Sequence, residues 1–277
     1  MKKIILVFDG TNYSETLLHF ITELNEVQPL LATGVFLPQV DYANLWSYAA
    51  AASESSGAAM AIPLIEPDEA ELVIANIKQF ESRCKKAGIA YRVHKDFTGF
   101  GIPELRKESR FADLVLLDGS QFFKNLGSDQ VNYLKETIHG LECPVIVLPE
   151  DGCLPESLVL AYDGSGDAVF AIKQFAYLFP EWSGLPALLV YTGSDEPADF
   201  PHKSLVRELV TQHFANLTIQ QLDLDPKKFF KTWLSQQKGA LLVSGSFGRS
   251  SMSQLFRKSF VSEVIKDHSI PVFMAHR

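Results

Sequence analysis

The sequence predicts an α/β protein built from two tandem five-stranded parallel sheets. Short, continuously apolar segments alternate with amphipathic helix patterns along the whole chain of 277 residues. This alternation is typical of a parallel sheet that is covered by helices on both faces. Three segments of the first half also recur, in the same order, in the second half. An internal repeat of this kind indicates a duplicated structural unit.

The repeat rests on three pairs of similar segments. They are 3–10 with 157–164, 112–120 with 239–246, and 143–148 with 270–275. The first pair consists of apolar strands that both end in Asp-Gly, at Asp9 and Asp163. Three matches in one order predict that the two halves share one topology, with corresponding strand ends at corresponding places.

We therefore predict two domains, at 1–150 and 155–277. The joint at about 150–156 contains Asp-Gly and Pro, which favour turns. Residues 41–66 have no counterpart in the second half and include a long Ala/Ser/Gly-rich run. Two interpretations of this insert stay open: a flexible or partly helical flap over the cleft of the first half, and an ordered extension packed on its neighbours.

The individual elements follow from hydrophobic periodicity. Ser14 is a candidate N-cap for a helix whose apolar stripe contains Leu17, Phe20, Ile21 and Leu24. In the first half the predicted strands are 3–8, 30–37, 89–93, 114–117 and 145–148, and the later helices are 67–86, 102–110 and 131–141. In the second half the predicted strands are 157–162, 187–191, 217–222, 240–243 and 272–275, and the helices are 167–179, 203–214, 226–236 and 261–268.

Composition excludes some classes of function. The formal net charge is -8, which argues against a general binder of nucleic acid or of an anionic membrane, because both need a broad basic surface. The three cysteines form no C-x-x-C motif and suit free thiols in a reducing compartment. No apolar run is long enough for a signal peptide or a membrane span, so we expect a cytoplasmic protein.

One stretch stands out against this acidic background. The loop from Gly245 to Ser259 contains Arg249, Arg257 and Lys258 but no Asp or Glu. It lies between a predicted strand and a predicted helix, where backbone N–H groups and the helix dipole favour an anion. A plain strand-to-helix connection is the alternative interpretation.

The repeat, the Asp at the end of the first strand, the glycine loop after the fourth and the Pro-Val final strand together resemble the universal stress protein family, in a two-domain form. The family pattern is G-x-x-G, nine residues, then Gly and Ser or Thr. Here Gly245 and Gly248 match, Ser259 matches the hydroxyl position, and Lys258 replaces the last glycine. The resemblance covers nearly the whole chain except the insert. It implies a Rossmann-like, adenine nucleotide alpha hydrolase-like fold.

The resemblance also implies a ligand and a site in the second domain. The ligand would be ATP or AMP, with or without Mg²⁺. Asp163 would contact the adenosine part, and the backbone of Val190 or Tyr191 would face the base. The ribose and phosphates would meet Gly245, Phe247, Gly248, Arg249, Lys258, Ser259 and Phe260. Lys258 could obstruct the phosphate path or neutralise a phosphate.

The first domain departs further from the family pattern. Phe122 stands where the second domain has Gly248, and the later Gly-Ser pair comes too early. We predict no nucleotide there, and we interpret Asp9 as a relic or a structural turn residue. The family commonly pairs its final strands antiparallel, so residues 145–148 are expected to pair with 272–275 and make an intramolecular pseudo-dimer.

Three functions stay open at this point. The first is a regulatory, stress-response protein that binds an adenine nucleotide and an unknown protein partner. The second is a scaffold of the same fold that binds no nucleotide, and the third is a nucleotide hydrolase, at most a slow ATPase. The sequence has no phosphate-binding P-loop, no nucleophile elbow and no metal-ligand spacing among its histidines. Further association into a homodimer is open.

Overall fold

The computed structural model describes residues 1–9, 11–37, 67–94, 101–122, 124, 130–191, 200–222, 232–237, 239–245 and 270–275. The insert at 41–66, the loop at 246–259 and the predicted helix at 261–268 lie outside these residues. Of the predicted helix at 226–236, only 232–236 are described, and 232–235 are helical.

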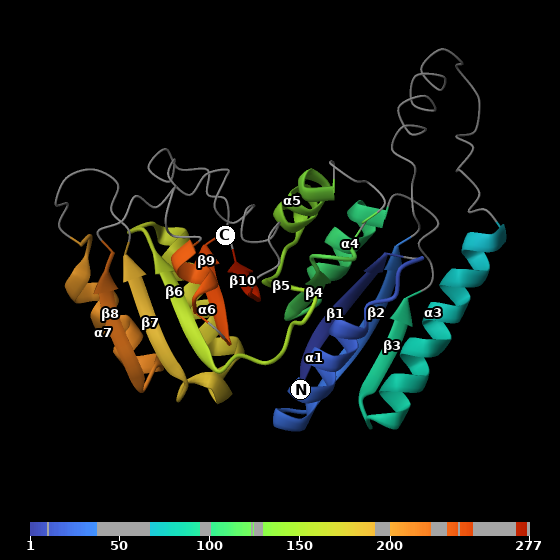
Figure 1. The fold of residues 1–277 in the computed structure, drawn as a ribbon, viewed down its shortest axis with the longest axis horizontal. Helices are drawn as coiled ribbons and strands as arrows, with labels where there is room; N and C mark the ends of the chain where they lie inside the picture. The colour runs from blue at the N-terminus through green and yellow to red at the C-terminus, as the bar shows by residue number, and fades with distance from the viewer. Residues whose placement is uncertain are drawn as a thin grey trace, which may run out of the picture.

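The strands form one ten-stranded sheet in the order β3-β2-β1-β4-β5-β10-β9-β6-β7-β8 (Figure 1). The first half contributes β1 (Lys2–Asp9), β2 (Leu30–Leu37), β3 (Ala90–His94), β4 (Leu114–Asp118) and β5 (Val145–Leu148). The second half contributes β6 (Ser157–Tyr162), β7 (Pro186–Tyr191), β8 (Asn216–Gln221), β9 (Ala240–Gly245) and β10 (Val272–Ala275). Each predicted strand is confirmed within about one residue at its ends, apart from the β9 end, which extends two residues further.

The two halves have the same internal strand order. Counted from its own first strand, each half runs 3-2-1-4-5, and all pairings within a half are parallel. The halves join where β5 and β10 pair antiparallel, with Ile146 opposite Phe273. The predicted pseudo-dimer is therefore confirmed. The joint also satisfies two strand edges that would otherwise be open to other chains.

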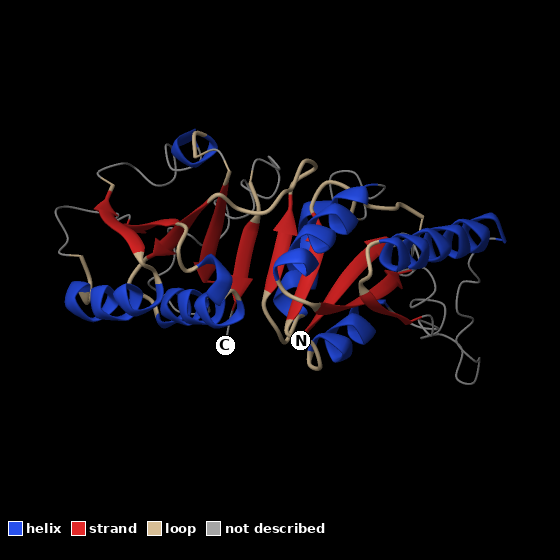
Figure 2. Ribbon diagram, turned by 90° about the horizontal axis from the view of Figure 1, so that it is seen from below, coloured by secondary structure: helices blue, strands red, loops and turns tan. Residues whose placement is uncertain are grey.

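Helices cover both faces of the sheet (Figure 2). The helices are α1 (Glu15–Val27), α3 (Pro67–Lys86), α4 (Gly101–Ser109), α5 (Gln130–Gly140), α6 (Gly166–Leu178) and α7 (Lys203–His213). Side chains of α1, α3, α6 and α7 enter one hydrophobic core, and those of α4 and α5 enter the core on the opposite face. The central strands are buried on both faces, which explains their continuous apolar sequences.

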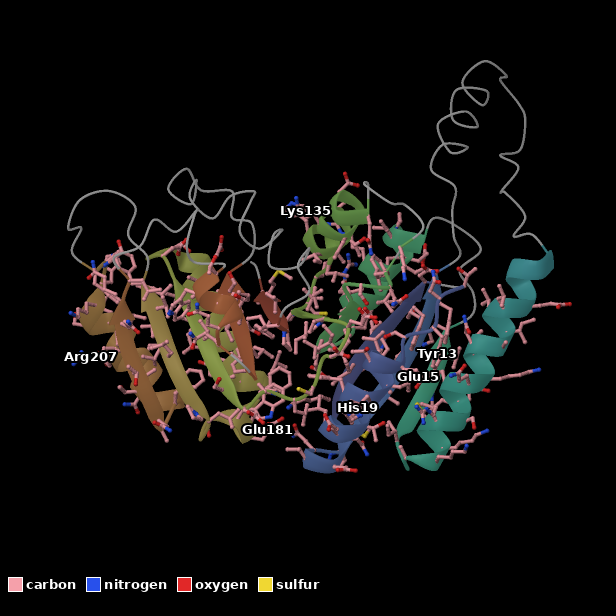
Figure 3. The ribbon with its side chains drawn as sticks, in the orientation of Figure 1. Tyr13, Glu15, His19, Lys135, Glu181 and Arg207 are labelled. Atoms are coloured by element: carbon pink, nitrogen blue, oxygen red, sulfur yellow. The ribbon has the colours of Figure 1, made fainter. Side chains whose placement is uncertain are left out.

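An aromatic cluster of the second half lies next to the junction with the first half. Phe175 of α6 and Phe179, which directly follows α6, lie edge-on to Phe273 of β10. At the same place Lys2 of the first half donates to Glu181 at 2.9 Å and lies 4.8 Å from the Phe179 ring centre. Figure 3 shows Glu181 at this junction. The short 3₁₀ helix η2 (Pro180–Trp182), which the periodicity did not predict, brings Glu181 there.

Candidate functional site

The carboxyl ends of three neighbouring strands meet at the predicted nucleotide site of the second half. Strand β6 pairs with β7 on one side and with β9 on the other. Asp163 follows β6 directly, Tyr191 ends β7, and Gly245 ends β9. In open α/β sheets the ligand crevice lies beyond such strand ends. The topology thus brings these predicted positions to one edge of the sheet.

Asp163 begins the turn that leads into α6. Its Oδ1 accepts a hydrogen bond from the Ser165 backbone N–H at 2.8 Å, and the Ser165 hydroxyl accepts from the Ala168 N–H at 3.1 Å as the N-cap of α6. Gly164 has φ +83°, which a side chain would strain. Asp163 itself is partly exposed. Its second oxygen, Oδ2, has no partner among the described residues.

Gly245 has a structural reason to be glycine. A Cβ atom built on it would lie 2.7 Å from the backbone N of Ala168 and 2.7 Å from the backbone C of Asp167. The end of β9 therefore packs directly against the first turn of α6. This contact fixes the end of β9 close to the N-terminus of α6.

Gly245→Ala is expected to lower the free energy of unfolding by about 1–3 kcal/mol even without any ligand, because the new methyl group must push β9 away from the α6 backbone. Urea unfolding followed by circular dichroism measures this loss. Gly184→Ala is the matched control, since nothing lies within 4 Å of its Cβ position. A loss of equal size at both glycines would contradict the proposed packing role.

Val190 and Tyr191 are both buried, with side chains on opposite faces of β7. The Tyr191 carbonyl accepts a hydrogen bond from the Leu222 N–H at 3.0 Å, so this backbone group is already engaged in the sheet. The Tyr191 ring lies 4.8 Å from that of Phe200. Its side chain therefore belongs to the core beneath the site.

Sequence reasoning missed an aromatic cluster next to Asp163. The Phe200 ring stacks on Tyr162 at 5.6 Å, and the Tyr162 hydroxyl donates to the Pro201 carbonyl at 3.0 Å. Burial, and then the Asp163 carboxylate, raises the pKa of both Tyr162 and Tyr191. These hydroxyls therefore stay protonated at neutral pH. The one available signal was the aromatic residue that ends both β6 and β7.

The remaining predicted site residues lie outside the described part of the chain. They are Phe247, Gly248, Arg249, Lys258, Ser259 and Phe260. Their roles stay predictions.

The corresponding turn of the first half is closed on itself. Asp9 is 2% exposed. Its Oδ1 accepts from the Thr11 N–H, the Thr11 hydroxyl and the Asn12 N–H at 3.2–3.3 Å, and its Oδ2 accepts from the Asn12 amide at 2.6 Å. Asp9 is thus a structural turn residue, in contrast to the partly exposed Asp163.

A second buried carboxylate locks the end of β4 in the first half. Asp118, 3% exposed, accepts a short hydrogen bond from the Ser14 hydroxyl, and Ser14 in turn caps α1. The other oxygen of Asp118, Oδ1, accepts from the Ser120 hydroxyl at 2.7 Å and from the backbone N–H groups of Ser120 and Gln121. The second half has Ser244 at this place, and its hydroxyl donates to the Gly245 carbonyl.

The loop after β4 is also occupied by a side chain from the next helix, α5. The Gln130 amide, at the start of α5, lies within 3.3 Å of the Gly119 and Ser120 carbonyls and 2.9 Å from the Phe122 carbonyl. Phe122 is 2% exposed. Backbone N–H groups that would face a phosphate in a binding loop are here bonded to Asp118, and a carboxylate at this place repels an anion.

The described residues contain neither a metal-ligand cluster nor a membrane-spanning helix. Within these ranges, no group of three or more His, Cys, Asp or Glu side chains is placed to hold a metal ion. No helix in the same part of the chain is long and apolar enough to cross a membrane.

Comparison with known proteins finds similar folds among solved structures but no similar sequence family. No protein-family model and no curated protein matches the sequence. Among solved structures, a universal stress protein from Archaeoglobus fulgidus is similar, with a TM-score of 0.70 and 16% sequence identity over 100% of this chain and 96% of that one. A functionally unknown protein from Pseudomonas aeruginosa is similar with a TM-score of 0.53 and 8% identity, over 100% and 92% of the two chains. The chain therefore has, over its full length, the fold of the universal stress protein family in its tandem form.

Proposed function

We propose that this protein is a cytoplasmic, regulatory stress-response protein whose second half, within a domain at 155–277, binds ATP or a related adenine nucleotide. One observation carries the proposal: Asp163 is partly exposed, with Oδ2 unpartnered among the described residues, at the strand ends that precede the glycine loop. An oriented carboxylate of this kind accepts hydrogen bonds from ribose hydroxyls. The spacing from Gly245 to Ser259 supports the same ligand.

The closed first half supports a single site per chain. Its equivalent carboxylate, Asp9, is saturated by its own turn, and its loop is filled by Phe122 and Gln130. We expect one mole of nucleotide per mole of chain. Occupancy of this one site would then be read by a protein partner.

Isothermal titration calorimetry with ATP, ADP and AMP, each with and without Mg²⁺, tests the proposal. Asp163→Ala is expected to weaken binding about tenfold or more, because a charge-assisted hydrogen bond contributes roughly 1.5–3 kcal/mol. Asp167→Ala is the matched control, since it removes the same charge four residues further along the chain. No binding to correctly folded protein at millimolar nucleotide would refute the proposal.

A second pair of variants locates the site. Gly248→Val should weaken nucleotide binding strongly, because a branched side chain blocks the approach of the loop backbone to a phosphate. Phe122→Gly, at the matching position of the first half, should leave the affinity unchanged. Small and equal effects would mean that the site lies elsewhere.

One observation favours a second candidate function. Lys258 stands where the family pattern has glycine, and a scaffold without nucleotide would tolerate this substitution. Absence of binding in the calorimeter selects this candidate. Steady phosphate release from ATP that Asp163→Ala abolishes would instead select a hydrolase.

A further inference from the structure

The two outer edges of the sheet differ in chemistry. Strands β3 and β8 lie at opposite ends of the molecule (Figure 1). Strand β3 carries Arg92, whose guanidinium donates to the exposed Tyr91 carbonyl at 3.0 Å, and His94, which lies 2.8 Å from the Glu108 carboxylate. Charged side chains on an edge strand are a known protection against pairing with other chains. The β3 edge is protected in this way.

Strand β8 has no such protection. Its sequence, Asn-Leu-Thr-Ile-Gln-Gln, contains neither charge nor proline. Asn216, Thr218, Gln220 and Gln221 are exposed, and within the described residues no strand pairs with the outer side of β8. A six-residue strand is long enough for a regular ladder.

The backbone groups available on β8 can be identified. Leu222 directs its N–H toward β7, where it donates to the Tyr191 carbonyl. In a parallel ladder every second residue turns its backbone polar groups to the same side, so Gln220 and Thr218 also face β7. The groups of Leu217, Ile219 and Gln221 therefore point outward.

We propose that β8 is a dimerisation edge that pairs antiparallel with β8 of a second copy of this chain. A second copy is the partner we infer, because the chain already contains one pairing of this kind. Strands β5 and β10, each the fifth strand of its half, pair antiparallel and join two halves of the same topology into one sheet. A two-fold axis places β8 beside an identical strand, and an uncharged strand pairs with its own copy without repulsion between like charges.

Antiparallel pairing joins hydrogen-bonded positions to each other. The register that uses all three outward residues places Ile219 opposite Ile219 of the second copy and Leu217 opposite Gln221 of the second copy. This arrangement makes about six intermolecular hydrogen bonds. Thr218 then lies opposite Gln220 of the second copy on the exposed face.

The flanking helix does not oppose this contact. Arg207 lies on α7 at this end of the molecule (Figure 3). Glu208 follows it directly, and both side chains are exposed. This helix therefore presents exposed charges of both signs rather than a run of one sign.

Sedimentation velocity of the full chain from about 1 to about 500 µM tests the proposal. The mean mass is expected to rise from 30.8 kDa toward twice that value. Thr218→Lys with Gln220→Lys should keep the chain monomeric at every concentration, because lysines then face each other across the two-fold axis. Thr218→Lys with Gln220→Glu should restore the dimer through two Lys–Glu pairs.

Two further variants separate backbone pairing from other contacts. Gln221→Pro removes an outward N–H without touching the bonds to β7 and should weaken the dimer at least fivefold, whereas Gln221→Ala should not. Ala90→Lys on β3 should have no effect. A wild-type chain that stays monomeric, equal masses for the Lys–Lys and Lys–Glu variants, or a dimer broken by Ala90→Lys would overturn the proposal.

Discussion

Asp9→Ala is expected to lower the free energy of unfolding by about 3 kcal/mol, whereas Asp163→Ala, at the equivalent place of the second half, should cost about 1 kcal/mol. The Asp9 carboxylate is buried and accepts hydrogen bonds from both backbone and side chain of Thr11 and Asn12. Its removal leaves buried donors without partners. Asp163 is partly exposed, so water can replace what its turn loses.

Urea unfolding of both variants measures the difference, with the nucleotide affinity determined on the same samples. The free energy of unfolding and the nucleotide affinity should respond differently in the two variants. Asp9→Ala should lower the free energy of unfolding and leave the affinity unchanged, whereas Asp163→Ala should keep most of the stability and lose affinity. Asp9→Asn retains Oδ1 as an acceptor but presents an amide to the Asn12 amide, so its stability should fall between wild type and Asp9→Ala. Equal stability losses at Asp9 and Asp163 would contradict the division of roles between the halves.

Asp118→Ala is expected to lower the free energy of unfolding by about 3 kcal/mol or more, because it removes a buried carboxylate that accepts hydrogen bonds from Ser14, Ser120 and Gln121. Ser244→Ala, at the same place in the second half, should cost less than about 1 kcal/mol. The Ser244 hydroxyl donates only to a neighbouring carbonyl within the described contacts. Chemical denaturation of both variants gives the comparison.

A double-mutant cycle with Ser14→Ala shows whether Asp118 acts through the helix cap. If the Ser14 hydroxyl links β4 to α1, Asp118→Ala should be less harmful in a Ser14→Ala background, with a coupling energy of roughly 1 kcal/mol or more. Strictly additive losses would mean that Asp118 stabilises its own loop alone.

Much of the fold could be predicted because the strands are buried on both faces. The run Ile-Ile-Leu-Val-Phe in β1 has no polar alternation, and its alternation with helix patterns along the chain indicates a parallel sheet between helix layers, which buries such a strand completely. The antiparallel β5–β10 joint was predicted from the resemblance to the universal stress protein family, whose final strands commonly pair in this way. The helix η2 was missed, since a three-residue turn around Pro180 has no periodicity to detect.

The site was less predictable, because its character depends on contacts between residues far apart in the chain. Asp9 and Asp163 follow similar strands and share the Asp-Gly motif, yet only the Thr11 and Asn12 side chains make Asp9 a closed turn. Gly245 was assigned to phosphate approach, but its contact with Asp167 belongs to packing. The Gln130 amide reaches the loop after β4 across eight residues or more of sequence, a distance that no local pattern encodes.

The antiparallel joint between β5 and β10 has an evolutionary consequence. In an assembly of two identical subunits, every substitution appears twice, so a side chain that fills the ligand loop of one subunit fills the same loop of the other. Here both halves are encoded once, side by side in a single gene. Mutation could place Phe122 in one loop, and Gln130 against it, while the counterpart loop kept its glycines. The covalent fusion thus allows the two loops to diverge independently, which is what the proposed single nucleotide site requires.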